Sequence, residues 1–138
     1  MKKIVIIDGQ GGGFGRALID KLCQQRPADC RIIAVGTNAM ATAAMIKAGA
    51  DVGATGENPV VVNSATADII AGPMGIVLAD SMLGEFTPKM AAAVAKSNAQ
   101  RVLIPVTKCS TFVAGVAEKP LAQYIEDAAA LIRTIAVK

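Results

Sequence analysis

The sequence predicts a single α/β domain over residues 1–138, with three layers and a mostly parallel sheet of about five or six strands. Short runs of β-branched residues alternate along the chain with segments whose apolar residues recur at helical spacing. This alternation predicts parallel strands joined by right-handed helical crossovers. The length is close to that of one ordinary domain, and 53% of the residues are hydrophobic, so one well-filled core is expected.

Two apolar runs predict the first two strands, each followed by a helix. The first run is KIVII at residues 3–7, and the second is RIIAVG at residues 31–36. After the first strand, apolar residues at helical spacing indicate a helix that ends by Pro27. After the second, Thr37 is the expected N-cap of a helix that reaches about Ala48. That second helix is apolar on nearly all sides, so we expect it to be well buried.

The middle of the chain predicts a loop and two further strands. We interpret residues 50–59 as a long loop and the three valines at residues 60–62 as the third strand. Residues 68–71 are the expected fourth strand, which breaks at Gly72. Residues 76–83 fit a helix or a strand, and the sequence leaves both open.

The last third of the chain predicts a helix, a strand and a final amphipathic helix. Thr87, followed by a proline, is the expected N-cap of a helix. Residues 101–106 then read as the fifth strand, and residues 111–116 as an additional edge strand. The final helix begins at Pro120 and places its apolar residues along one face.

The segment GQGGGFG, residues 9–15, lies directly between the first strand and its helix. Its glycines allow backbone N–H groups and the helix N-terminus to approach a phosphate, and ligands of parallel sheets bind at the carboxyl ends of the strands. We therefore expect a phosphorylated, nucleotide-like ligand here, against the alternative of a tight turn without a ligand. The expected binding residues come from this loop and from the loops after the second and fourth strands: Asp8, Gly9, Gln10, Gly11, Gly12, Gly13, Phe14, Gly15, Thr37, Asn38, Gly72, Pro73 and Met74.

The spacing G-x-x-x-G-x-G of Gly9, Gly13 and Gly15 resembles the cofactor loop of the short-chain dehydrogenases/reductases. The resemblance implies a Rossmann-like fold and NAD or NADP as the cofactor. The catalytic Tyr-x-x-x-Lys of that family has no counterpart, because Tyr124 is the only tyrosine and Ala128 stands four residues later. The second strand also lacks a terminal acidic residue for a ribose, which leaves NAD and NADP open. A conventional dehydrogenase is not expected.

The same loop also resembles the deviant P-loop of partitioning ATPases, because GGGFGRA parallels G-G-x-G-K-[ST]. Arg16 replaces the lysine, and Ala17 replaces the hydroxyl that binds magnesium. The resemblance implies that a phosphate cradle survives without Mg²⁺-dependent hydrolysis. An active P-loop NTPase is not expected, and whether the chain is an enzyme stays open.

Longer segments are similar to a small bacterial family known as a domain of unknown function with Rossmann-like architecture. They are IDGQGGGFG, residues 36–58, residues 72–88 and residues 104–110. The similarity runs nearly from end to end. It implies the fold and brings no established activity.

Composition excludes several classes of partner. The net charge of +3 is spread along the chain, without the clustered basic and aromatic residues of nucleic-acid binding proteins. No apolar run is long enough for a membrane helix or a signal peptide, so we expect a cytoplasmic protein. Cys23, Cys30 and Cys109 lack C-x-x-C spacing and the chain has no histidine, so free thiols and no metal site are expected.

Four further polar residues are candidates for contact with a ligand. Glu57 and Asn58 lie in a glycine-rich segment, where a solvated turn is the alternative. Lys108 and Cys109 follow the fifth strand, where an anion contact or a nucleophilic thiol is conceivable and an ordinary thiol is favoured. For Asp8 we also expect a structural role, in which it orders the glycine loop by accepting backbone N–H bonds.

Two apolar segments, residues 39–50 and 73–83, exceed what one small core readily covers, so we expect a homodimer. The sequence as a whole predicts a nucleotide-binding protein with NAD or NADP as its expected ligand. The alternative is a non-catalytic, oligomeric regulatory or interaction domain that reuses the fold without a cofactor.

Overall fold

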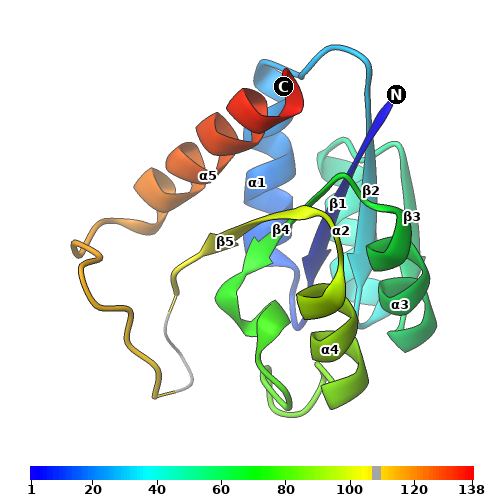
Figure 1. The fold of residues 1–138 in the computed structure, drawn as a ribbon, viewed down its shortest axis with the longest axis vertical. Coiled ribbons are helices and arrows are strands. Elements are labelled where there is room, and N and C mark those ends of the chain that lie inside the picture. The colour runs from blue at the N-terminus through cyan, green and yellow to red at the C-terminus, as the bar shows by residue number, and fades with distance from the viewer. Residues whose placement is uncertain (107–109) are drawn as a thin grey trace.

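The computed structural model describes residues 1–106 and 110–138, and within them all strands form one parallel sheet (Figure 1). The strand order is β3-β2-β1-β4-β5, so β1 lies at the centre and the connections run outward in both directions. This arrangement confirms the predicted α/β fold with a parallel sheet. The strands are β1 (Lys2–Asp8), β2 (Cys30–Gly36), β3 (Val52–Thr55), β4 (Ile69–Pro73) and β5 (Gln100–Ile104).

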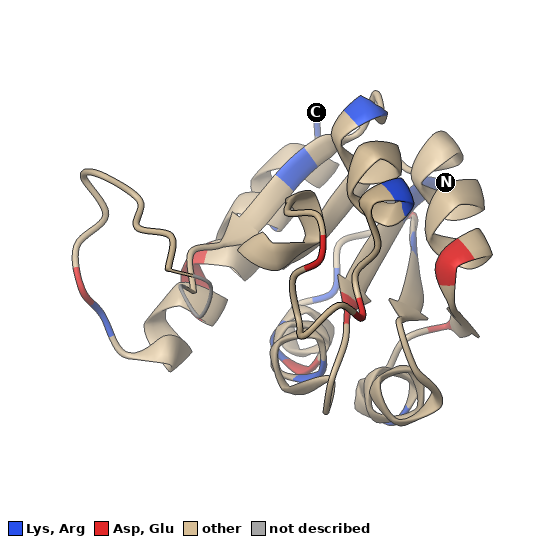
Figure 2. Ribbon diagram, turned by 90° about the horizontal axis from the view of Figure 1, so that it is seen from below, with Lys and Arg blue, Asp and Glu red and all other residues tan. Residues whose placement is uncertain are grey.

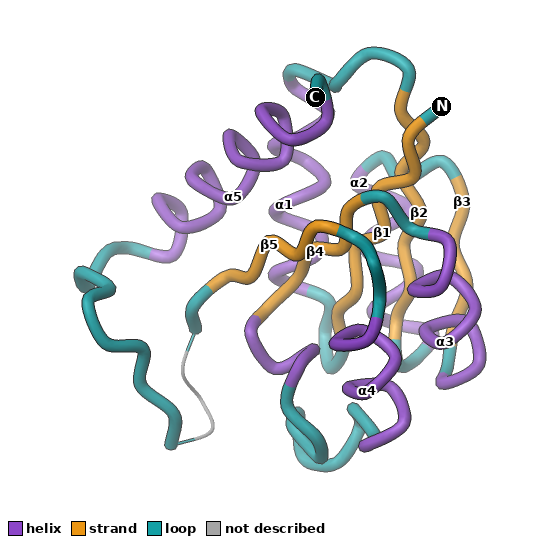
Figure 3. The backbone as a smooth tube through the Cα atoms, in the orientation of Figure 1, coloured by secondary structure: helices purple, strands orange, loops and turns teal. Residues whose placement is uncertain are grey.

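Helices cover both faces of the sheet and complete the three layers (Figure 3). One apolar cluster joins α1, α2 and α5 to one face, and a second joins α3 and α4 to the other. The helices are α1 (Gly13–Gln24), α2 (Ala39–Ala48), α3 (Glu57–Thr66), α4 (Pro88–Lys96) and α5 (Leu121–Ala136), with the short 3₁₀ helix η1 (Met74–Val77) after β4.

The side chains of the central strand β1 alternate between the two apolar clusters. Ile4 and Ile6 point to the face of α1 and α5, while Val5 and Ile7 point to the face of α3 and α4. All four side chains are completely buried. A strand covered on both faces reads as a continuous apolar run rather than an alternating one, which is why residues 3–7 gave so clear a signal.

The third strand differs from the prediction. Residues 60–62 lie in α3, and β3 is the short edge strand of residues 52–55, inside the segment interpreted as a loop. The strand preference of three valines is overridden by packing, because Val60 and Ser64 lie one helical turn apart and are both completely buried. Val62 points away from the sheet and is 54% exposed.

The second helix also differs in its cap and in its burial. Asn38, not Thr37, caps α2, because its side-chain oxygen accepts the backbone N–H of Ala41 at 2.9 Å. The expectation of a well-buried helix is wrong in part, since Met40 is 70% exposed and Ile46 is 45% exposed. The alanines between the larger residues made the segment read as apolar on all sides.

Several boundaries in the second half agree with the prediction, and two do not. Thr87 caps α4 by accepting the N–H of Met90, and α5 begins directly after Pro120, as predicted. The fourth strand, however, continues through Gly72 to Pro73. The expected edge strand at residues 111–116 is absent from the described residues.

Residues 110–120 instead form an exposed arm between β5 and α5 that extends away from the rest of the domain (Figure 1).

Positively and negatively charged residues are dispersed over the elements rather than gathered by sign (Figure 2). Among the described residues, no helix has the length and apolarity needed to cross a membrane. The expected homodimer stays a prediction.

Candidate functional site

A pocket of about 720 Å³ opens at the carboxyl ends of β1 and β4. This is the point where the chain's connections diverge, toward β2 on one side and toward β4 on the other, and parallel sheets bind their ligands in that crevice. The glycine loop and the first turn of α1 form one wall, and the segment after β4 forms the opposite one together with Val106 and Leu121. The lining residues are Asp8, Gly9, Gln10, Gly11, Gly12, Gly13, Phe14, Arg16, Ala17, Pro73, Gly75, Ser81, Met82, Leu83, Val106 and Leu121.

Asp8 holds the glycine loop in place from below. Its carboxylate is only 2% exposed, and its two oxygens accept the backbone N–H groups of Gly9 at 2.8 Å and Gly15 at 2.7 Å. Burial raises the pKa of the Asp8 carboxyl above its usual value, against the lowering effect of these amide bonds. The prediction that Asp8 orders the loop by accepting backbone N–H bonds is confirmed.

Of the five loop glycines, Gly9, Gly12 and Gly15 pack closely against other segments, and two lie open. Gly12 has a φ of 74°, and a Cβ there would lie 2.8 Å from the Cα of Ala41 on α2. Gly15 approaches Met45 and Asp8 just as closely, so a side chain at either glycine would force α1 and α2 apart. In contrast, a Cβ at Gly11 or Gly13 would meet no other part of the protein within 4 Å.

Two backbone amides in this loop are unpaired within the described chain. The N–H of Gly12 donates to the carbonyl of Gly9 at 2.9 Å, and that of Gln10 donates to the carboxylate of Glu85 at 2.8 Å. The N–H groups of Gly11 and Gly13 find no acceptor among residues 1–106 and 110–138. They stand at the start of α1, where the helix dipole adds partial positive charge.

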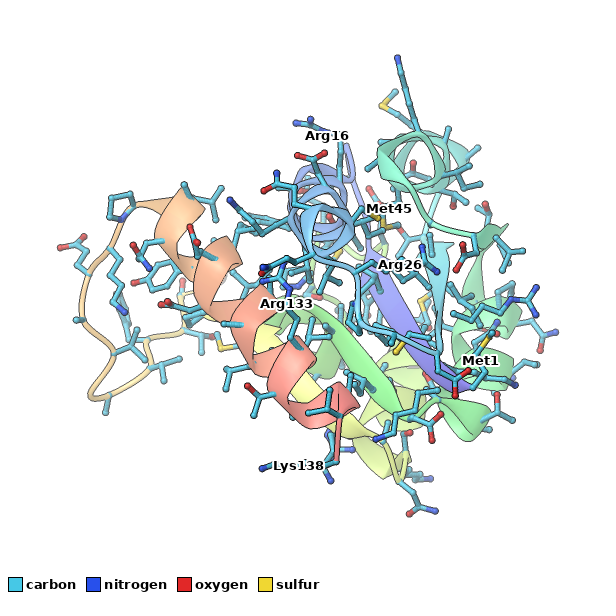
Figure 4. All side chains as sticks on the ribbon, turned by 90° about the horizontal axis from the view of Figure 1, so that it is seen from above. Met1, Arg16, Arg26, Met45, Arg133 and Lys138 are labelled. Atoms are coloured by element: carbon cyan, nitrogen blue, oxygen red, sulfur yellow. The ribbon has the colours of Figure 1, made fainter. Side chains whose placement is uncertain are left out.

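A cation stands at the rim of the same wall. Arg16 lines the pocket from the first turn of α1 and points outward into solvent (Figure 4). It forms no ion pair with any acidic residue in the part of the chain that the structure describes. Because its guanidinium is always charged, it adds to the attraction that the helix N-terminus exerts on an anion.

The opposite wall is largely apolar. It is formed by Met82, Leu83, Val106 and Leu121, and the side chain of Leu83 is 98% exposed. The hydroxyl of Ser81 donates to the carbonyl of Gly75 at 2.6 Å, which ties this wall to the turn after β4. An apolar wall opposite a polar, glycine-lined one is typical of a site for a ligand with both a ring and an anionic group.

Two predicted site residues lie beside the pocket rather than in it. Thr37 and Asn38, at the end of β2, both donate to the same oxygen of Glu85, at 2.5 Å and 2.9 Å. These bonds, led by that of the Thr37 hydroxyl, lower the pKa of Glu85 below its usual value. Glu85 could not be identified from the sequence, because its hydrogen-bond partners lie 47 to 75 residues away along the chain.

The remaining predicted residues have packing roles or lie elsewhere. Gly72 packs close to the carbonyl of Ile7 on the neighbouring strand. Among the described residues, the pocket lining does not include Gly15, Gly72 or Met74. Glu57 lies at the start of α3 and accepts the hydroxyl of Thr87 at 2.6 Å, which links α3 to α4.

The lining also lacks Asn58, while Lys108 and Cys109 lie outside the described residues. Among the described cysteines, Cys23 and Cys30 are free, as predicted.

The only tyrosine lies in a different hollow. Tyr124 donates its hydroxyl to the carbonyl of Ala117 at 2.7 Å and accepts the N–H of Lys119 at 3.2 Å. These bonds fasten the base of the exposed arm to α5, in a hollow of about 410 Å³ beside β5. The phenol of Tyr124 therefore stabilises the base of the arm and does not line the glycine-loop pocket.

Comparison with known proteins places the whole chain in one family. The sequence model of a family described as "Domain of unknown function (DUF3842)" matches residues 3–137. A search of curated proteins gave no match. Among solved structures, the chain is similar to a dodecameric FMN-dependent Ubix-like decarboxylase from Escherichia coli O157:H7, at 18% identity and a TM-score of 0.46. That match covers 96% of this chain and 76% of the decarboxylase chain.

Proposed function

We propose that this chain, which belongs to the DUF3842 family, binds a phosphorylated, nucleotide-type ligand in the glycine-loop pocket. The observation that carries the proposal is the pair of unpaired backbone amides at Gly11 and Gly13, which line the pocket at the N-terminus of α1. Both glycines are exposed, and the first N–H groups of any helix lack an intrahelical partner, so these two amides are available to a ligand. Because both residues line the same pocket, the loop is suited to an anion.

The expected strength of the phosphate contact follows from its chemistry. Hydrogen bonds from backbone amides to a charged oxygen each contribute about 1.5–3 kcal/mol, and the helix dipole and the guanidinium of Arg16 add to them. Asp8 leaves these amides free, because its oxygens are already occupied by the amides of Gly9 and Gly15.

The other wall suits the ring of such a ligand. Met82, Leu83 and Val106 present apolar surface opposite the glycine loop, and the volume falls within the range of ordinary cofactor sites, about 300–1,000 Å³. Burial of the exposed surface of Leu83 against a flat ring would contribute through the hydrophobic effect. NAD and NADP, the ligands expected from the sequence, and flavin nucleotides all combine a ring with a phosphate in this way.

A ligand screen by thermal unfolding tests the proposal. A ligand at about 100 times its dissociation constant raises the free energy of unfolding by about 2.7 kcal/mol, which corresponds to roughly 5–10 °C for a domain of this size. We expect a shift of this order from at least one member of a panel of nicotinamide, flavin and adenine nucleotides, and none from the corresponding nucleosides. The absorbance of the purified protein provides a second readout, because a chain without Trp contributes little of its own.

A panel without any shift, together with a preparation free of ligand absorbance, would contradict nucleotide binding. That outcome would favour the regulatory or interaction domain without a cofactor. A shift from the nucleosides alone would place the ring in the pocket and leave the loop amides without a role.

We further predict that the chain does not catalyse nicotinamide-dependent reduction of simple ketones or aldehydes. Hydride transfer to a carbonyl needs a proton donor within reach of the oxygen, and Tyr124 is engaged with Ala117 at the base of the arm. The assay follows nicotinamide absorbance during incubation with a carbonyl panel. Turnover that survives in Tyr124→Phe would contradict the prediction and reveal a different proton donor.

A further inference from the structure

A short segment crosses over the glycine loop, and we call residues 80–86 the strap. Its two ends are joined by an antiparallel bridge between Ser81 and Phe86, and the N–H of Asp80 donates to the carbonyl of Phe86 at 2.8 Å. Phe86 is completely buried in the cluster beneath α4 and anchors the strap in the core. The strap thus has a fixed base and a tip formed by residues 82–85.

The tip lies directly on the loop at Gly9. A Cβ at Gly9 would stand 2.6 Å from the sulfur of Met82 and 3.1 Å from Oε1 of Glu85, so no ligand atom has room between strap and loop at this point. The same oxygen of Glu85 accepts the N–H of Gln10 and the side chains at the end of β2. The pocket lies on the β4 side of this contact, and the end of β2 lies on the other side.

The contact between strap and loop matters because a dinucleotide has to occupy both the pocket on the β4 side and the space at the end of β2. In sheets of this order, one nucleotide lies over the centre of the sheet and the other over the end of β2, where its ribose is held, and the pyrophosphate crosses the glycine loop between them. Here the crossing is covered by Met82 and Glu85. The donors that a second ribose would meet, Thr37 and Asn38, are already bonded to Glu85.

We propose that Glu85 is a specificity-determining residue, which holds the strap on the glycine loop and restricts the pocket to mononucleotides. This inference rests on the proposed function and narrows the ligand class that follows from it. The expected ligand carries one terminal phosphate on the amides of Gly11 and Gly13 and one ring against Met82 and Leu83. A dinucleotide would bind only after the three hydrogen bonds of Glu85 are broken.

Backbone strain in the strap explains why such a tether is needed. Asp80, Met82 and Leu83 have positive φ values of 62°, 58° and 57°, a region that residues with a side chain rarely adopt. Conformations of this kind persist only where surrounding contacts hold them. Without the tether at Glu85, the tip is therefore expected to lift from Gly9 while the buried base stays in place.

The test compares matched mononucleotide and dinucleotide probes on three forms of the full chain. The probes are FMN against FAD and nicotinamide mononucleotide against NAD, with affinities measured by fluorescence or calorimetry. For the wild type we expect each dinucleotide to bind at least 10-fold more weakly than its mononucleotide. In Glu85→Ala this ratio should approach one, because the strap is released.

Glu85→Gln is the matched control. It removes the negative charge but keeps an acceptor oxygen for the N–H of Gln10 and for Thr37 and Asn38, so the ratio should stay as in the wild type. An equal gain in affinity for both probe classes in both variants would reflect only the lost negative charge, and it would overturn the role of Glu85 in excluding dinucleotides. Thermal unfolding of each variant establishes that it is folded.

The outcomes separate the two proposals. If neither these probes nor any nucleotide of the thermal-unfolding panel binds the wild type, nucleotide binding itself is wrong. If mononucleotides bind and FAD or NAD binds the wild type equally well, the restriction by the strap is overturned without any variant. An unchanged ratio in a folded Glu85→Ala protein would overturn the role of Glu85 alone.

Discussion

Gly13→Val is expected to lower the affinity for a phosphorylated ligand about 100-fold and to leave the fold intact. A Cβ at Gly13 meets no other part of the protein within 4 Å, and its φ is not in the left-handed region, so a side chain is tolerated in the free protein. The isopropyl group would occupy the space in front of the amides of Gly11 and Gly13, where we place the phosphate. Calorimetry gives the affinity, and thermal unfolding confirms that the variant is folded.

Gly12→Val is the control for this prediction, because it should lower the stability of the fold, whereas Gly13→Val should lower only the affinity for the ligand. Its Cβ would collide with the backbone of Ala41, and its φ of 74° disfavours any branched residue. We expect a loss of roughly 2–4 kcal/mol in the free energy of unfolding, from strain and from the displacement of α2. Equal affinity of wild type and folded Gly13→Val for the ligand would refute phosphate binding at the loop.

Asp8→Ala is expected to destabilise the domain by about 2–4 kcal/mol, because it removes the buried acceptor of two amides. The N–H groups of Gly9 and Gly15 would be left without the carboxylate that now receives them at 2.8 and 2.7 Å. The loop would also lose its shape, so nucleotide affinity should fall together with stability. Urea unfolding measures the first effect and calorimetry the second.

Asp20→Ala, on the helix α1 that follows the glycine loop, provides the matched comparison. Asp20 is exposed and engages in no salt bridge with any described residue, so its removal should change the free energy of unfolding by less than about 0.5 kcal/mol. A loss in Asp8→Ala no larger than that of Asp20→Ala would show that the loop does not depend on the buried carboxylate.

The elements that could be predicted from the sequence are those whose local signals agree with their packing. The continuous apolar run of residues 3–7 reflects a strand buried on both faces, and the Thr87 cap is a local hydrogen bond that its own sequence specifies. The prediction of a strand at residues 60–62 failed because one of these valines packs on the sheet and another faces solvent, which only the tertiary structure decides.

The site divides along the same line. The glycine loop and Asp8 are adjacent in sequence and could be recognised from spacing alone. Glu85 reaches Gln10 and Thr37 only through the fold, and its segment, GEFTP, reads locally as an ordinary turn before a helix. The apolar wall was missed for the same reason, since Leu83 and Leu121 come together from distant segments.

The most direct test of the central claim follows the backbone amides themselves by nuclear magnetic resonance. Isotopically labelled protein would be titrated with inorganic phosphate and, separately, with FMN, while the amide shift of each residue is recorded. Binding at the loop predicts that the amides of Gly11 and Gly13 move most with both ligands, and that amides of the Met82–Leu83 wall move with FMN only. If the amides of Gly11 and Gly13 stay unmoved while another region responds, or if no amide responds to either ligand, the glycine loop is not a phosphate site.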